Sequence, residues 1–435
     1  MSNIKSRLII MNFLQFAVWG SYLTSMGSML AGLGLGKNIG IFYAMQGIVS
    51  LFMPAIIGII ADRKVQAQRL LGICHLVAAL FMVSSAYLIS STTGTPDVNL
   101  LLTLYTLSVA FYMPTLALSN SVAYTALEKS GLDTVSAFPP IRVWGTVGFI
   151  CAMLVCDFAG FQTSYMQFYQ SALLGLILAG YAFTLPTCPV NTSKDKRSLV
   201  DSLGLRAFTL FKQKKMAMFF IFSMLLGVSL QITNGFANPF ITSYESIPQY
   251  ADTFAAQHAN ALISLSQISE TLCILLIPFF LKRFGIKIVM LIAMFAWVLR
   301  FGLFGIGNPG DGVWMFILSM IVYGVAFDFF NISGSLFVNE NTSSEMRSSA
   351  QGLFMIMTNG IGATIGTLGA QAVVNRFVPE ATKNLEGVVT NGNIIAEGWS
   401  HTWLIFAGYA LVVALAFWVM FKYKHEPNKL DNINH

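Results

Sequence analysis

Hydrophobic residues occur along most of this chain in runs of about twenty or more, separated by short polar or turn-rich breaks. A helix of about 20 apolar residues crosses the ~30 Å hydrocarbon core of a bilayer. Long unbroken runs, rather than ten-residue stretches of alternating polarity, favour helices over a barrel. The pattern predicts an all-α membrane protein with twelve transmembrane helices, at residues 7–31, 38–61, 69–92, 98–121, 140–160, 163–186, 216–242, 258–281, 286–307, 311–338, 347–376 and 400–421.

Composition agrees with this pattern. Of the 435 residues, 55% are hydrophobic and 10% are charged, whereas ordinary soluble domains carry about 25% charged residues. The first apolar run, from Arg7 to Leu30, is long enough to span and lacks a small-residue cleavage site. We therefore interpret it as the first transmembrane helix and not as a cleavable signal peptide.

The lysines and arginines orient the chain in the membrane. Loops on one side carry 20 of the 25, loops on the other side carry three (Lys37, Arg376 and Lys383), and Arg142 and Arg300 fall inside predicted helices. Positive charge is concentrated in cytoplasmic loops, so this split places both termini in the cytoplasm. The net charge of +6 then follows from topology and gives no reason to expect a nucleic-acid partner.

A long basic and polar stretch divides the twelve spans into two sets of six. We expect an N-terminal six-helix bundle at 1–188, a cytoplasmic linker at 189–215, and a C-terminal six-helix bundle with a short cytoplasmic tail at 216–435. Two six-helix halves joined in this way are typical of major facilitator transporters.

A short motif supports that comparison. Gly58, Asp62, Arg63 and Lys64 stand at the cytoplasmic end of the second span, as G-x-x-x-D-R-K. They match part of the G-x-x-x-D-R-x-G-R motif of that superfamily, without its last glycine and arginine. Residues 282–285 (K-R-F-G) occupy the corresponding place in the second half. A charged helix end meeting the cytosol explains each motif alone, and their symmetric placement favours the superfamily.

Apart from groups at the ends of spans, four charged residues lie within the predicted spans, namely Arg142, Glu270, Arg300 and Asp328. A charge at the bilayer centre costs at least about 2.5–3.5 kcal/mol, so such residues are functional candidates. Arg300, near the middle of the ninth span, has no evident partner in the sequence. It requires either a carboxylate partner elsewhere or a different helix boundary.

Polar residues line one face of several spans. In the fifth span, Arg142, Thr146 and Phe149 share a face at i, i+4 and i+7, just after two prolines that suit the first turn of a helix. The alternative for Arg142 is an arginine that extends to the membrane interface. In the seventh span Gln231 and Asn234 lie three residues apart.

The eighth span repeats the spacing of the seventh, with Gln267 and Glu270. A hydrogen bond between helices explains a single amide, but a carboxylate with three amides at matching spacings favours a binding site. In the tenth span, Tyr323 and Phe327 share a face, with Asp328 beside them. Aromatic rings beside amides and acids suit a planar ligand with a hydrogen-bonding rim.

One further stripe, on the first span, has two equally good interpretations. Gln15, Trp19 and Tyr22 follow one another at i, i+4 and i+7. Such a stripe either lines a pocket or packs against neighbouring helices.

Over essentially its whole length, the sequence resembles the bacterial nucleoside:proton symporter family of the major facilitator superfamily. The matching segments are residues 13–21, 138–146, 230–234, 266–270 and 326–334. The resemblance implies the major facilitator fold, location in the inner membrane, and a central site that opens alternately to either side. It also implies that nucleoside is held by Arg142, Thr146, Phe149, Gln231, Asn234, Gln267, Glu270, Tyr323, Phe327 and Asp328.

An uncharged nucleoside requires a separate ion for uphill import, and the resemblance implies a proton. We expect Asp328 to carry it, with Glu270 as the other candidate, and we expect a monomer without a cofactor. A facilitator for another solute, such as a sugar or a drug, remains the alternative because its site uses similar residue types. The absence of H-E-x-x-H and G-x-S-x-G motifs and of a large soluble domain argues against an enzyme or a receptor.

Overall fold

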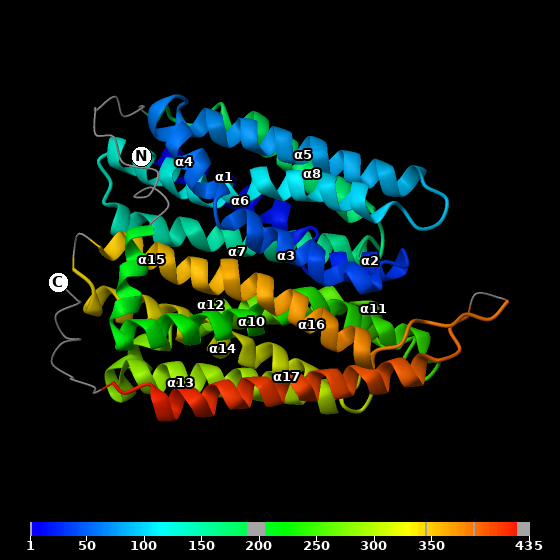
Figure 1. The fold of residues 1–435 in the computed structure, drawn as a ribbon. Helices are drawn as coiled ribbons and strands as arrows, with labels where there is room; N and C mark the ends of the chain where they lie inside the picture. The colour runs from blue at the N-terminus through cyan, green and yellow to red at the C-terminus, as the bar shows by residue number, and fades with distance from the viewer. Residues whose placement is uncertain (1, 189–204, 344–345, 386–387, 424–435) are drawn as a thin grey trace. The chain divides into compact units, whose positions relative to one another are not determined.

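The computed structural model describes residues 2–188, 205–343, 346–385 and 388–423. This part of the chain is almost entirely helical, apart from one isolated bridge between Lys383 and Val389. The chain divides into two compact units, Met1–Leu203 and Gly204–His435 (Figure 1). Of the expected linker, residues 189–204 lie outside the described part, as does the expected tail from residue 424 onward, and Leu205–Lys212 forms the short helix η2.

The first unit contains the first six predicted spans. Its helices are α1 (Ser2–Gly20), α2 (Met26–Gly32), α3 (Ile39–Ser50), α4 (Met53–Arg63), α5 (Ala67–Ser91), α6 (Val98–Lys129), α7 (Thr134–Phe158) and α8 (Met166–Ala182), with a 3-10 turn, η1 (Gly36–Asn38), before α3. The spans predicted at 7–31 and 38–61 are each built from two helices. In the second case a proline in the first turn of α4 marks the break, where its missing N–H needs no intrahelical partner.

The second unit contains the other six spans. Its principal helices are α10 (Lys214–Thr242), α12 (Ala259–Ile274), α13 (Ile277–Ile306), α14 (Val313–Asn341), α15 (Arg347–Met355), the π-helix η4 (Ile356–Gly362), α16 (Ala363–Phe377) and α17 (Gly392–Met420). Two short helices, η3 (Ser243–Ser246) and α11 (Phe254–Gln257), connect α10 to α12. The eleventh span is therefore α15, η4 and α16 in succession.

The eighth and ninth spans meet inside α13, at a glycine. Gly285 has φ 75° and ψ 169°, outside the helical region. Glycine lacks the Cβ that makes positive φ unfavourable for other residues, so the chain turns here at a single position. The eighth span thus consists of α12 and the first part of α13, and the ninth begins after Gly285, as the sequence predicted.

Among the described residues, eight helices are long and apolar enough to cross a membrane without interruption. The remaining four spans are interrupted or short. Three are the pairs α1 with α2, α3 with α4, and α12 with the start of α13, and the fourth is α8, which has 17 residues. The structure accordingly has helices at all twelve predicted spans.

The two units repeat one pattern of helix pairing. In the first unit α1 packs on α7, α5 packs on α6 and α8, and α3 and α4 pack on α6. In the second unit α10 packs on η4 and α16, α13 packs on α14 and α17, and α12 packs on α14. The first span packs on the fifth, and the seventh span packs on the eleventh. In the same way, the third span packs on the fourth and sixth, and the ninth packs on the tenth and twelfth. Figure 1 shows α13 and α17 running alongside each other.

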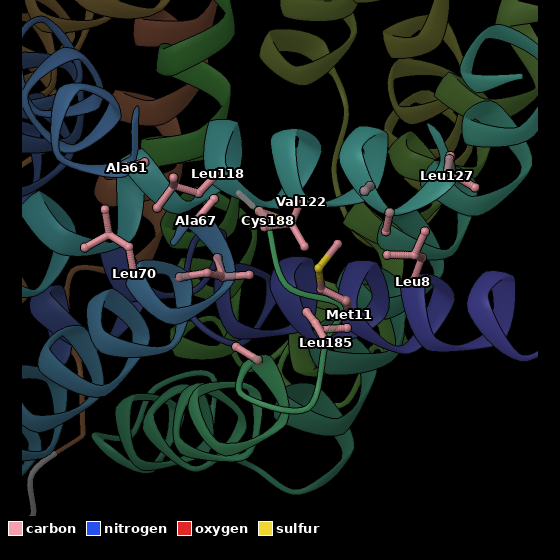
Figure 2. Close-up of a cluster of buried hydrophobic side chains, with 14 of the residues drawn as sticks. Leu8, Met11, Ala61, Ala67, Leu70, Leu118, Val122, Leu127, Leu185 and Cys188 are labelled. Atoms are coloured by element: carbon pink, nitrogen blue, oxygen red, sulfur yellow. The ribbon is translucent and has the colours of Figure 1, made fainter. Parts of the chain in front are cut away.

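At one end of the first unit, an apolar cluster joins six helices, namely α1, α4, α5, α6, α7 and α8 (Figure 2). Leu8 and Met11 of α1 meet Leu70 of α5 and Val122 of α6, and all four are at least 94% buried. Leu185, just after α8, packs on the same cluster. Full burial of side chains of this kind stabilises by about 1.5–3 kcal/mol each, so this end of the bundle is firmly packed.

Glycines bring paired helices close together in both units. A Cβ at Gly148 of α7 would overlap the backbone carbonyl of Phe13 on α1, and a Cβ at Gly227 of α10 would overlap that of Thr358 in η4. Small residues let helix backbones approach in membranes, where van der Waals packing replaces much of the hydrophobic driving force. These two glycines therefore allow α7 to approach α1 closely, and α10 to approach η4.

We expect Gly148→Ala to destabilise the protein, because the added methyl group meets backbone atoms that cannot rotate away. Overpacking of this kind costs about 1–3 kcal/mol. Gly180→Ala in α8 is the matched control, since a Cβ there meets nothing within 4 Å. The melting temperature of the detergent-solubilised protein should fall by several degrees in the first variant and stay near the wild-type value in the second. Equal melting temperatures would contradict this account of the α1–α7 contact.

Candidate functional site

The fifth span begins earlier than the sequence suggested. Helix α7 starts at Thr134, so Pro139 and Pro140 lie inside the helix and not in its first turn. Arg142 is consequently more than two turns from the helix start. The interpretation of the two prolines as a helix beginning was wrong, because upstream residues continue the helix despite two missing N–H donors.

Arg142 lies against α1. The carbon at the centre of its guanidinium is 3.9 Å from the centroid of the Phe16 ring, a cation–π contact of about 0.5–2 kcal/mol. Thr146, one turn further along α7, is half-buried. Phe149 is 8% exposed, and its ring meets Trp19 edge to face at 6.3 Å. The three predicted residues of α7 thus share a face that is packed on α1.

Of the three residues in the stripe on the first span, two pack against neighbouring helices and one keeps an open surface. Gln15 and Tyr22 are at most 1% exposed and belong to the interior of the first unit. Gln15 donates to the Thr115 hydroxyl (2.7 Å) and bonds His75 Nε2 through its carbonyl oxygen (2.8 Å). Trp19 is half-buried and donates to Gln46 at 3.2 Å. Gln15 and Tyr22 therefore pack, and Trp19 retains an open surface.

Gln267 and Glu270 of α12, on the eighth span, meet the aromatic and acidic residues of α14, on the tenth span. The Gln267 side chain lies within hydrogen-bonding range of the Tyr323 hydroxyl, and the charges of Glu270 and Asp328 both act on Tyr323. Glu270 and Asp328 also interact electrostatically with each other. Helix α12 packs directly on α14, so these four residues form one polar cluster in the second unit.

The aromatic residues of this cluster differ in exposure. Tyr323 is 5% exposed, and its ring stacks on Phe327 at 5.7 Å with an interplanar angle of 6°. Trp297 of α13 meets the Tyr323 ring edge to face at 5.9 Å. Phe327 is only half-buried. A flat ligand can therefore lie on Phe327, while Tyr323 supports that ring from behind and presents its hydroxyl to Gln267.

The two amides on α10 form a pair of their own. Asn234 Nδ2 donates to Gln231 Oε1 at 3.5 Å, and both side chains are half-buried. Helix α10 packs on α12 and α14, which carry the acidic and aromatic cluster. The second unit thus places seven of the ten predicted residues on three mutually packed helices, and the first unit places the other three on α7.

The acid Asp328 is 5% exposed, and its Oδ2 has no hydrogen-bond partner among the described residues. A buried ionised carboxylate without its hydrogen bonds is strongly unfavourable, whereas the protonated form is far less so. This chemistry suits a group that gains and loses a proton. No group of three or more histidine, cysteine, aspartate or glutamate residues is placed to hold a metal ion within the described ranges.

The family of nucleoside H+ symporters matches residues 1–426 of this chain. The chain belongs to the nucleoside H+ symporter family. The symporter is 47% identical over 438 residues to the nucleoside permease NupG of Escherichia coli (strain K12), with 100% of each chain covered. It is 46% identical to the xanthosine permease of the same organism, with 99% of each chain covered.

Solved structures establish the fold. The crystal structure of the nucleoside transporter NupG superimposes with a TM-score of 0.87 at 47% identity, covering 97% of this chain and 100% of that chain. A bacterial homologue of the lysosomal transporter Spinster shares the fold at 13% identity, with a TM-score of 0.68 over 96% of each chain. The prediction of an all-α membrane protein with the major facilitator fold is confirmed. The symporter is a multi-pass inner-membrane transporter, and it is not an enzyme.

The sequence did not reveal which residues of other helices pack against the predicted site residues of each unit. Phe16, which lies under Arg142, and Trp297, which meets Tyr323, are apolar residues in apolar segments. Their roles depend on contacts between spans that are far apart in the chain. Arg300 was visible as a charged residue, but its surroundings were not.

Replacing Gln15 with leucine should destabilise the first unit, because His75 Nε2 then loses its partner in a dry interior. An unsatisfied buried polar group costs about 1–3 kcal/mol. Leu14→Met, a neighbouring apolar exchange in α1, is the control. We expect the melting temperature in detergent to fall by several degrees for Gln15→Leu only. A wild-type melting temperature for Gln15→Leu would show that this hydrogen bond contributes little.

Proposed function

We propose that this chain is a proton-coupled symporter that imports nucleosides, such as uridine or adenosine, across the bacterial inner membrane by alternating access. The observation that carries the proposal is the cluster on α12 and α14, in which an amide, two acids and two stacked aromatic rings meet. Membership of the nucleoside H+ symporter family supports it.

The chemistry of the cluster fits a nucleoside. A base is flat and can stack on the half-buried Phe327, while its edges and the ribose hydroxyls need donors and acceptors. Gln231, Asn234, Gln267 and Glu270 supply both kinds of group. Arg142, Thr146 and Phe149 enter the proposed binding set through the resemblance to the family, and Tyr323 and Asp328 complete it.

Coupling requires a group that binds the proton. We propose Asp328 for this role, with Glu270 chiefly holding substrate. Asp328 Oδ2 lacks a hydrogen-bond partner within the described residues, so the neutral, protonated carboxyl is the form that its surroundings favour. Opening to a proton-poor side then exposes the acid to water, where it ionises.

We base the proposed topology in the membrane on the distribution of lysine and arginine residues. Both termini and the linker at 189–215 face the cytoplasm, and the linker joins the bundles 1–188 and 216–435. The transporter works as a monomer and needs no cofactor besides the proton. Its nearest rival function is import or export of another solute, such as a sugar or a drug.

Competition experiments separate these two functions. Uridine and adenosine should displace a labelled nucleoside from the purified protein, and glucose or galactose should not, because Phe327 offers a ring face that suits a base. Thermal stabilisation by the same compounds is the second measurement, since a ligand stabilises by RT ln(1 + [L]/Kd). Stabilisation by hexoses without stabilisation by any nucleoside would overturn the proposal.

Asp328→Asn should abolish uphill uridine uptake in vesicles with an imposed proton gradient, because an amide cannot carry the proton. Uridine exchange at equal pH and uridine-dependent thermal stabilisation should persist, since asparagine keeps a similar shape and polarity. Phe295→Leu, an exchange of an exposed residue on α13, serves as the control. Undiminished accumulation by Asp328→Asn would remove this residue from the coupling role.

A further inference from the structure

Arg300 is the buried charge in the second unit to which the proposed mechanism gives no role. Its side chain is fully buried within α13, at 0% exposure, so it does not face lipid as a central arginine on an outer span would suggest. Taking a charged group out of water is strongly unfavourable unless the charge is compensated. The residue therefore has to be explained by what surrounds it.

The guanidinium connects three helices. Its Nη1 donates to the backbone carbonyl of Ser319 on α14 at 2.5 Å and lies 3.5 Å from the Ser266 hydroxyl on α12. The Ser319 hydroxyl in turn donates to the backbone carbonyl of Arg300 at 3.0 Å. These contacts join the eighth, ninth and tenth spans at one level.

The same guanidinium covers the ring of Tyr323. The central carbon is 4.8 Å from the Tyr323 centroid and 5.1 Å from that of Phe304. Tyr323 therefore contacts a cation as well as Phe327 and Trp297, which fixes the plane of its ring. Its hydroxyl is held in the direction of Gln267.

The positive charge of Arg300 also acts on the residues of the cluster. Its Nε and Nη2 have no hydrogen-bond partner in the described part of the chain, and the groups that Nη1 contacts, the Ser319 carbonyl and the Ser266 hydroxyl, are uncharged. The charges that reach Tyr323 are those of Arg300, Glu270 and Asp328. With both acids ionised, these three groups carry one net negative charge, and a single proton makes them neutral. A neutral set is the one that a dry interior favours.

Other titratable groups around the cluster lie on the packed helices. Cys273 of α12 interacts electrostatically with Asp328. On α17, which packs on α13, Ser400 bonds the Gly305 carbonyl, so the neighbouring Glu397 and His401 lie more than a turn away from the level of Arg300. Tyr409 of α17 donates to the Leu225 carbonyl of α10.

We propose that Arg300 is a positioning residue of the transport site, which fixes the Tyr323 ring behind Phe327 and supplies the constant positive charge that limits the two acids to one proton. This inference rests on the proposed function. The planar guanidinium performs the first task by stacking, and its charge performs the second. The two tasks can be separated by substitution.

Arg300→Lys retains the charge but loses the planar stack and most of the donors. We expect it to raise the KM for uridine about tenfold or more and to leave the pH dependence of uptake near that of the wild type. Arg300→Gln removes the charge but can still donate to the Ser319 carbonyl. Without the cation, the acids keep their protons to higher pH, so the pH at which uptake falls to half should rise by about one unit.

Phe406→Leu is the matched control, because it is a buried residue of α17 whose ring packs on Phe301 and Trp403 and not on the residues of the cluster. It should lower the melting temperature without changing the KM or the pH profile. If both Arg300 variants behave like this control, Arg300 is structural only and the inference is overturned. If Arg300→Gln does not fold, the KM of Arg300→Lys decides, and an unchanged value overturns the inference.

Uridine-dependent thermal stabilisation of the wild-type protein is measured in parallel. If the wild type is stabilised and the Arg300 variants have its KM and pH profile, the inference fails while the proposed function stands. If uridine does not bind the wild type at all, the proposed function fails and this inference fails with it.

Discussion

Each polar side chain inside a lipid-embedded helix must find its partner within the protein, because the surrounding hydrocarbon offers none. This requirement organises both units. In the first, Gln15 joins α1 to His75 on α5 and Thr115 on α6. In the second, Arg300 joins α13 to α12 and α14. Hydrogen bonds of this kind connect helices that apolar packing alone would leave free to slide or rotate.

Residues that escape this requirement are the ones available for a solute. Gln231 and Asn234 are half-buried, whereas Gln15 is enclosed and bonded to Thr115 and His75. The amide pair on α10 bonds only weakly, at 3.5 Å, so a ligand can replace that contact at small cost. The polar groups of a transport site are thus those that do not make all their hydrogen bonds within the protein, so a solute can bind to them.

The twelve spans could be predicted because a bilayer demands long apolar runs, and such runs are visible in one dimension. The faces of α7, α10, α12 and α14 followed from helical spacing. What spacing does not contain is the neighbour on another helix. The packing of Gln15 and Tyr22, the ring of Phe16 under Arg142 and the carbonyl that accepts from Arg300 all depend on tertiary contacts. The start of α7 was predicted too late in the chain, because Pro139 and Pro140 were interpreted as the first turn of a helix. In the structure the helix begins at Thr134 and continues through both prolines.

The turn at Gly285 has a mechanical consequence. Because a single glycine joins the two parts of α13, the chain has almost no slack between the end of the eighth span and the start of the ninth, which carries Arg300. A change in the tilt of the eighth span at this end should therefore also move the start of the ninth span. Glu270 and Arg300 therefore lie on successive spans whose adjoining ends cannot separate.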